Sequence, residues 1–93
     1  MAVRSFKDAE TEAVYNDQPS IRFQAIERVA RRKLLVLHSA SDLRVLAINR
    51  GNRLEALKYD RLGQHGIRIN DQWRICFVWK EGDVFDVEIT DYH

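Results

Sequence analysis

The chain has 93 residues, 45% of them hydrophobic and 31% charged, and its formal net charge is +1. A chain of this length buries about 60–65% of the surface that it exposes when unfolded, so we expect one domain over residues 1–93 and no disordered segment. No apolar stretch reaches the roughly 18–20 residues of a membrane span, and the N-terminus lacks the pattern of a signal peptide. The one cysteine, Cys76, excludes a disulfide within the chain and is expected to be a small core residue. We therefore expect a cytoplasmic protein with no membrane partner.

Charge is unevenly distributed along the chain. Residues 1–20 hold two basic and four acidic side chains, and residues 81–93 hold five acidic and no basic ones. Between these ends, residues 21–80 hold thirteen basic and five acidic side chains. A basic block of this kind can follow a phosphate backbone, and it is equally compatible with ordinary solvated helix and strand faces.

The first part of the chain predicts a short strand and two helices. Residues 2–6 can form the strand, and Ser5 or Asp8 then caps a helix over Ala9–Tyr15, whose acidic residues near its start suit the helix dipole. The only proline interrupts the chain at position 19, and from residue 20 to 37 apolar residues recur every three or four positions. We expect the two helices to form a hairpin that lies across a sheet.

The middle of the chain is less regular. Residues 43–49 are compatible with a helical turn or with an extended segment, because their apolar residues fit neither period clearly. Residues 53–58 alternate well enough to predict a strand that is short or bulged. Residues 59–66 form a polar stretch with two glycines, which predicts a loop.

The last third of the chain carries the clearest sheet pattern. Apolar and polar residues alternate over 67–70, 73–80 and 84–91, with short polar turns between these runs. The pattern predicts an antiparallel meander with one apolar face. If the odd-numbered residues of these runs face the helices, Phe85 among them, then the even-numbered residues face away.

The open face of the predicted meander is polar. It would carry Arg68, Asn70, Arg74 and Tyr92. Two guanidinium groups on one open face can bind phosphate, since each presents a fork of N–H donors. As an alternative, Arg68 and Arg74 can pair across strands with Asp86 or Glu88.

The chain ends in an acid, a phenol and an imidazole, Asp91-Tyr92-His93. A strand so close to the terminus is held only if it pairs within a sheet. Strand alternation would place the side chains of Asp91 and His93 on the inward face. The last residue of a chain does not have to follow this alternation, because a strand end can fray.

The sequence predicts neither a metal site nor a cofactor. The three histidines are scattered at positions 38, 65 and 93, and Cys76 has no partner at ligand spacing. The glycines form no phosphate-cradling motif.

Four segments, in this order and at this spacing, resemble the HigB group of bacterial toxins, within the RelE-like superfamily of toxin–antitoxin systems. They are Arg4-Ser5-Phe6-Lys7, Leu54-Glu55-Ala56-Leu57-Lys58-Tyr59-Asp60-Arg61, Ile67-Arg68-Ile69-Asn70-Asp71-Gln72-Trp73-Arg74-Ile75 and Asp91-Tyr92-His93. The resemblance implies an α+β fold in which two N-terminal helices pack on a twisted, mainly antiparallel sheet of four to five strands. It also implies a metal-independent, ribosome-dependent endoribonuclease that cuts mRNA in the decoding site and inhibits translation. The implied partners are the ribosome and a helix-turn-helix antitoxin of the HigA type, through which DNA is contacted only indirectly.

The resemblance also shows one departure. Similar HigB toxins have a catalytic histidine where this chain has Glu55, while other RelE-like toxins such as YoeB use a glutamate base in this region. Glu55 is therefore either a chemical substitute for the histidine or an ordinary strand residue in a weakened enzyme.

Metal-free RNA cleavage requires a base for the 2′-hydroxyl, cations for the charge at phosphorus and an acid for the departing 5′-oxygen. We expect Glu55 to be the base and His93 the acid, since a free glutamate is deprotonated near neutral pH and a histidine can give a proton there. The expected catalytic set is Glu55, Lys58, Arg68, Arg74, Tyr92 and His93. The expected RNA-binding residues are Arg53, Arg61, Asn70 and Asp91.

Two other functions remain open at this point. The chain can be a catalytically weakened or inactive family member that binds the antitoxin or the ribosome, as the departure at Glu55 indicates. It can also be a general RNA-binding domain, for which the basic block is the only indication.

Overall fold

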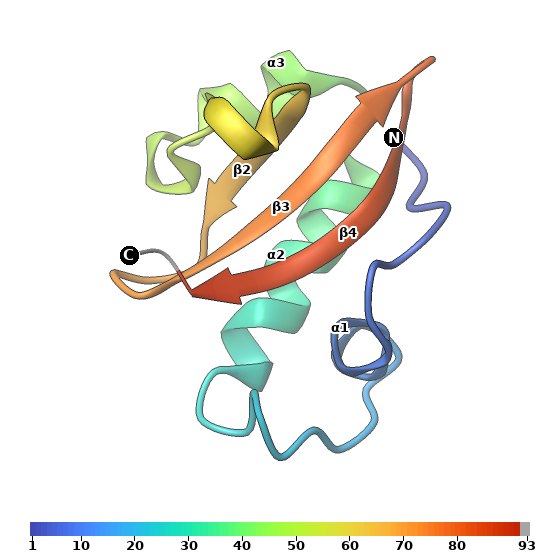
Figure 1. Cartoon of the computed structure of the whole chain (residues 1–93), viewed down its shortest axis with the longest axis vertical. Helices are drawn as coiled ribbons and strands as arrows, with labels where there is room; N and C mark the ends of the chain where they lie inside the picture. Colours follow the sequence, from blue (N-terminus) through green and yellow to red (C-terminus); the bar gives the residue numbers. More distant parts are fainter. Residues whose placement is uncertain (92–93) are drawn as a thin grey trace.

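The sheet is the centre of the computed structural model, which describes residues 1–91 (Figure 1). Its strands are β1 (Glu55–Ala56), β2 (Gln64–Arg68), β3 (Trp73–Lys80) and β4 (Asp83–Asp91). They lie in the order β1-β2-β3-β4, and each pairs antiparallel with the next. The short polar turns predicted between the last three strands join them as hairpins, which confirms the meander.

Three α-helices and two 3-10 helices complete the described part of the chain. They are α1 (Ala9–Tyr15), α2 (Glu27–Ser39), α3 (Leu43–Ile48), η1 (Arg50–Asn52) and η2 (Tyr59–Arg61). Figure 1 shows α2 crossing behind the sheet and the chain around residue 60, drawn in yellow, in front of it. The expected α+β architecture, with helices packed on an antiparallel sheet of four strands in the described residues, is confirmed. Within residues 1–91 no helix is long and apolar enough to cross a membrane.

The core lies between the helices and one face of the sheet. Ile67, Ile75 and Ile89 are register partners across β2, β3 and β4, and all three are almost fully buried. The helices contribute the other half of this core. Its helical and loop members include Val14, Phe23, Ala30, Leu34, Leu37 and Leu46. This packing leaves the other face of the three strands open, as the alternation predicts.

The outer edge of β4 is covered by the N-terminal segment. Val3 and Phe6 form isolated parallel bridges with Val84 and Val87, and backbone hydrogen bonds run in both directions between the two stretches. The predicted first strand is thus reduced to two bridges. The pairing protects an edge that would otherwise expose unpaired N–H and C=O groups.

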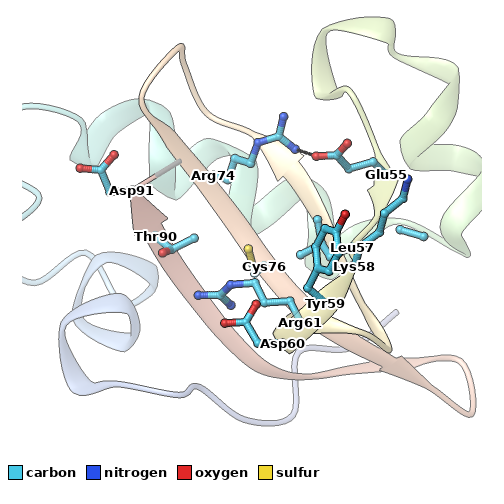
Figure 2. A pocket seen from close by; sticks show the side chains of 11 residues that line it. Glu55, Leu57, Lys58, Tyr59, Asp60, Arg61, Arg74, Cys76, Thr90 and Asp91 are labelled. Atoms are coloured by element: carbon cyan, nitrogen blue, oxygen red, sulfur yellow. Dashed lines mark hydrogen bonds and ion pairs between the residues drawn. The ribbon is translucent and has the colours of Figure 1, made fainter. Parts of the chain in front are cut away.

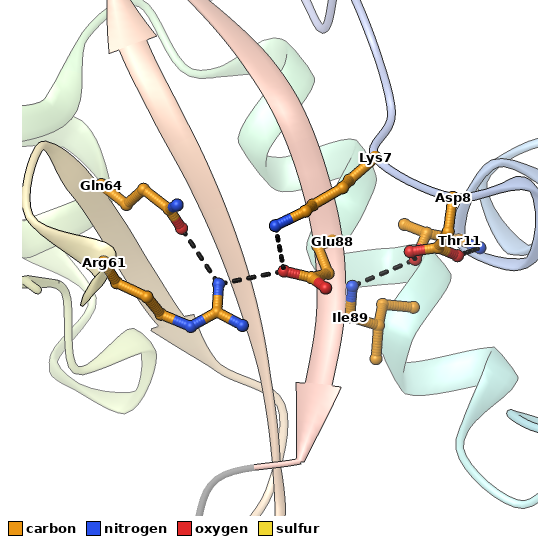
Figure 3. A network of polar contacts seen from close by, with 7 residues as sticks. All are labelled: Lys7, Asp8, Thr11, Arg61, Gln64, Glu88 and Ile89. Atoms are coloured by element: carbon orange, nitrogen blue, oxygen red, sulfur yellow. Dashed lines mark hydrogen bonds and ion pairs between the residues drawn. The ribbon is translucent and has the colours of Figure 1, made fainter.

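Asp8 caps α1 and, through Thr11, fixes it to β4. The Asp8 carboxylate accepts hydrogen bonds from the backbone N–H and the hydroxyl of Thr11. The buried Thr11 hydroxyl oxygen in turn accepts from the backbone N–H of Ile89, at 3.0 Å (Figure 3). Of the two predicted caps, Asp8 is therefore correct. The same Thr11 side chain that bonds to Asp8 also connects α1 to β4 at Ile89.

The expected helix over residues 20–37 is wrong at its start, because α2 begins only at Glu27. Residues 21–26 form turns instead, and the Ser20 hydroxyl accepts the N–H of Phe23 at 3.4 Å. Phe23 is nevertheless fully buried and meets Trp73 edge-on, with ring centroids 5.4 Å apart. Apolar spacing marked which residues are buried but could not distinguish successive turns from a helix.

The alternation also fails at Phe85. A bulge interrupts the pairing of β3 and β4 between Cys76 and Val78, and Asp86 has a left-handed backbone with φ of +53°. One extra residue in a strand shifts every side chain beyond it to the other face. As a result Val84 is buried and Phe85 is only partly buried, the reverse of the expectation.

The ambiguous stretch 43–49 forms α3, because the Asp42 carboxylate caps it by accepting the N–H groups of Arg44 and Val45. The strand predicted over residues 53–58 is confirmed as a short one, reduced to the two residues of β1. β2 begins at Gln64, inside the predicted loop.

Candidate active site

The open face of the sheet brings together polar residues that are far apart in sequence. Arg68 is the register partner of Arg74, which in turn pairs with Thr90. One step further along the strands, Cys76 pairs with Glu88. Both rows lie on the face opposite the buried isoleucines, as the alternation predicts.

A pocket of about 520 Å³ opens on this face where the chain from β1 through η2 faces β3 and the end of β4 (Figure 2). Its lining consists of Glu55, Ala56, Leu57, Lys58, Tyr59, Asp60, Arg61, Arg74, Cys76, Thr90 and Asp91. Small-molecule sites usually measure about 300–1,000 Å³, so the pocket has room for a nucleotide-sized group.

Glu55 and Arg74 form an ion pair at one end of this pocket (Figure 2). The side chain of Arg74 is 13% exposed and that of Glu55 is 42% exposed. A guanidinium that is partly withdrawn from water interacts more strongly with an anion than a solvated one does. The pair places an acceptor carboxylate directly beside a cation that can hold a phosphate.

A second hollow, of about 260 Å³, adjoins the first one and shares Arg74 with it. It is lined by Arg53, Arg68, Asn70, Asp71 and Arg74. Three guanidinium groups around one hollow create a strongly positive site that suits a phosphate. The only acidic lining residue is Asp71, which pairs with Arg68 and is 98% exposed.

Within residues 1–91, Arg68 and Arg74 form ion pairs other than the alternative ones with Asp86 or Glu88. Arg68 pairs with Asp71 and Arg74 with Glu55, and Glu88 pairs with Arg61. Both arginines therefore remain on the walls of the two hollows.

Arg61 lies in the wider pocket and is held firmly. One guanidinium nitrogen donates to Glu88 at 2.9 Å and to Gln64 at 3.1 Å, and Lys7 approaches the same Glu88 oxygen at 3.9 Å (Figure 3). Desolvation is the largest single influence on Arg61 and opposes its charge, but the hydrogen bond to Glu88 and the attraction of nearby negative groups together raise the pKa of the guanidinium. These contacts fix η2 above the sheet.

Asn70 has a local structural role. Its side-chain oxygen accepts the N–H groups of Gln72 and Trp73, both at 2.8 Å, and so shapes the turn between β2 and β3. Asn70 still lines the smaller hollow, so this turn function and the expected contact with RNA are compatible.

Cys76 is buried, as expected, and it also lines the pocket on the open face of the sheet. Burial raises the pKa of its thiol, although the nearby Arg61 opposes this effect. The even position of Cys76 in the alternating run was the signal that could have placed it on this face.

Asp91, which alternation predicts on the inward face, is exposed at the end of β4. It accepts a hydrogen bond from the Gln72 amide at 3.2 Å and is one of the residues that line the pocket. Lys58 is exposed on the rim. Tyr92 and His93 lie outside the described residues.

Among residues 1–91 no three histidine, cysteine or acidic side chains lie close enough to hold a metal ion.

The structure thus brings eight of the ten expected site residues to two adjoining hollows. They are Arg53, Glu55, Lys58, Arg61, Arg68, Asn70, Arg74 and Asp91. Tyr59 and Thr90 also line the wider pocket but were not predicted as site residues. Tyr59 belongs to η2, which was predicted as part of a loop, and no local sequence pattern indicates that this segment lies beside Thr90 on β4.

Comparison with known proteins defines the family of the chain. A family profile described as the RelE-like toxin of the type II toxin–antitoxin system HigB matches residues 4–93. Toxin HigB-1 of Vibrio cholerae serotype O1 is 38% identical over 79 residues, which cover 83% of each chain. The chain belongs to the HigB family of type II toxins.

Solved structures of related toxins share the fold of this HigB-family chain. YoeB in a heterotetrameric YoeB–YefM toxin–antitoxin complex from Staphylococcus aureus aligns with a TM-score of 0.58, at 18% identity, covering 100% of this chain and 99% of that one. A YoeB/ParE toxin from Agrobacterium tumefaciens aligns with a TM-score of 0.53, at 16% identity, covering 97% and 99%. At these identities the likeness concerns the fold alone.

Proposed function

We propose that this HigB-family toxin is a ribosome-dependent endoribonuclease that cleaves mRNA by attack of the 2′-hydroxyl on the adjacent phosphorus. The observation that carries the proposal is the position of Arg74, which belongs both to the arginine-lined hollow and to the pocket that holds Glu55. In RNA the 2′-hydroxyl and the attacked phosphate belong to neighbouring groups of one chain. A base beside a phosphate-binding cation is therefore the arrangement that this reaction needs.

In the proposed reaction the scissile phosphate replaces Glu55 as the partner of Arg74, and Arg68 binds a second phosphate oxygen. Glu55 accepts the 2′-hydroxyl proton while the bond between O2′ and phosphorus forms. The bond between phosphorus and O5′ then breaks, and O5′ takes a proton from His93. Lys58, Arg68 and Arg74 offset the charge that builds on the phosphate oxygens. Tyr92 contacts the substrate.

The remaining polar residues of the two hollows extend this site along the RNA. Arg53 and Asn70 line the smaller hollow, while Arg61 and Asp91 line the wider pocket. A groove that combines cations with hydrogen-bonding groups follows a single strand without reading its sequence. Placement of the mRNA by the ribosome supplies the rest of the orientation, which can contribute several kcal/mol to a reaction of this type.

The proposed partner is a helix-turn-helix antitoxin of the HigA type. Its support is the family assignment, together with the YoeB–YefM complexes in which structurally similar toxins were solved.

A catalytically weakened toxin is the second candidate function. The observation that favours it is the ion pair itself, because a Glu55 carboxylate that pairs with Arg74 neutralises the guanidinium that should hold the phosphate. Such a protein would still bind antitoxin or ribosome but would not arrest growth. Replacement Glu55→His, which introduces the residue of similar HigB toxins, would then increase cleavage.

Induction of the toxin in bacterial cells, followed by mapping of mRNA 5′ ends, tests the proposal. Wild type should produce new 5′ ends within translated frames, and Arg74→Ala and His93→Ala should abolish most of them. Arg44→Ala is the matched control, since Arg44 pairs with Asp42 on α3 and lines neither hollow. Equal cleavage by all four proteins would refute the site, and absence of both cleavage and growth arrest in wild type would favour the second candidate.

A further inference from the structure

Tyr59 combines two unfavourable features on the rim of the wider pocket. Its side chain is 90% exposed, and its backbone lies in the left-handed region with φ of +58°. An exposed aromatic ring contributes no core packing, and a bulky residue in this backbone region is strained. Residues held in such conformations cluster at functional sites. Neither the core nor the turn accounts for an aromatic residue at this position.

The surrounding structure holds Tyr59 in place. The carbonyl of Lys58 accepts the N–H of Arg61 at 3.1 Å, and the carbonyl of Tyr59 accepts the N–H of Leu62, also at 3.1 Å. Arg61 is in turn anchored to Glu88 on β4 (Figure 3). The ring is therefore attached to a short helix that is itself fixed to the sheet.

Charged groups of both signs line the pocket beside the ring. Lys58 precedes it, Asp60 and Arg61 follow it within the same pocket, and in Figure 2 its hydroxyl points toward the end of the pocket where Glu55 and Arg74 lie. An exposed aromatic ring on an anchored backbone segment, with cations beside it, can bind an unstacked base of single-stranded nucleic acid, since the ring stacks on the base and the cations bind the backbone.

We propose that Tyr59 is the stacking platform for an RNA base next to the cleaved phosphate. The inference rests on the proposed function and assigns the wider pocket to one nucleotide, with Arg61 and Thr90 among its other lining residues. Stacking on a tyrosine accepts any base, so Tyr59 determines how firmly and where the RNA is held rather than which sequence is cut.

The backbone of Tyr59 allows a test in which loss of the ring does not weaken the fold. Tyr59→Gly removes the ring and relieves the strain, so its melting temperature should equal or exceed that of wild type. Its kcat/KM for mRNA cleavage on programmed ribosomes should fall roughly 5- to 150-fold, the effect of losing one stacked base. Tyr59→Asn, which also tolerates this backbone region, should behave similarly, and Tyr59→Phe should retain activity.

Leu62→Ala is the matched control, since Leu62 is 81% exposed in the same loop but does not line the pocket. A single-stranded RNA oligonucleotide that carries 2-aminopurine reports stacking directly. Its fluorescence should be quenched by wild type and Tyr59→Phe but not by Tyr59→Gly. Equal cleavage and equal quenching by wild type and Tyr59→Gly would overturn the inference and leave the proposed function standing. If wild type cleaves no mRNA, the proposed function fails, and the fluorescence alone decides the inference.

Discussion

The replacement Glu55→Gln separates two roles that Glu55 can have. As the general base its carboxylate takes the 2′-hydroxyl proton, which an amide cannot do, and loss of a positioned base lowers a rate by roughly 10²- to 10⁴-fold. As a simple partner of Arg74 it competes with the phosphate, and the neutral glutamine would then leave the rate unchanged or raise it. The two roles predict opposite signs, and the base assignment predicts the fall.

The effect of Glu55→Gln on folding should be small. The Glu55 side chain is 42% exposed, so the attraction between Glu55 and Arg74 is screened by water. Such pairs contribute about 0–1 kcal/mol, and the glutamine oxygen can still accept a hydrogen bond from the guanidinium. The free energy of unfolding should therefore change by less than about 1 kcal/mol, and a large loss of activity would not be a loss of fold.

The assay is single-turnover cleavage of a defined mRNA on programmed ribosomes, with urea unfolding of the same samples. Asp71→Asn is the control, because it removes the negative charge beside Arg68 as Glu55→Gln removes that beside Arg74, but it removes no candidate base. Cleavage by Glu55→Gln at or above the wild-type rate would refute the base assignment. An equal fall in Asp71→Asn would show that arginine pairing is what matters.

Three further predictions concern stability and reactivity. Thr11→Val leaves the buried N–H of Ile89 without its acceptor and should lower the free energy of unfolding in urea by about 1–3 kcal/mol. The hydrogen bond from Arg4 lowers the pKa of Asp83, so this stabilisation is present above about pH 4 and is lost as the pH falls further. Asp83→Asn should therefore flatten the acid side of the stability curve. Burial raises the pKa of Cys76, so native protein should react slowly with a thiol reagent at pH 7 and urea-unfolded protein quickly.

The sequence predicted the sheet well where alternation was regular. The bounds of β3 agree with the expected run, and Arg68 and Arg74 lie on the open face because a strand places every second side chain on the same side. The prediction failed at Phe85. The bulge there depends on the left-handed backbone of Asp86, and such a conformation cannot be predicted from the sequence when the residue is not a glycine.

The start of α2 could not be found from local pattern. Residues 21–26 bury Phe23 with the same spacing that a helix would have, and burial alone therefore gave the wrong boundary. The cap of α3 was readable, since Asp42 precedes the apolar run. The Asn52 amide also donates to the carbonyl of Leu46, a contact that the apolar pattern of residues 43–49 does not indicate.

The site was partly predictable because charged residues at even positions of the meander point to one face. Its other wall could not be predicted, because η2 is brought over the sheet by long-range contacts. The ion pair between Arg61 and Glu88 spans 27 residues, and the pair between Glu55 and Arg74 spans 19. Nothing in the local sequence indicates either partner.

The chemical ends of a cleaved mRNA test the central claim most directly. Attack by the 2′-hydroxyl leaves a 2′,3′-cyclic phosphate on the upstream fragment and a 5′-hydroxyl on the downstream one. We predict these ends when purified toxin acts on a programmed ribosome, and their loss in Arg74→Ala but not in Arg44→Ala. A 5′-phosphate with a 3′-hydroxyl, or an intact mRNA, would contradict the mechanism.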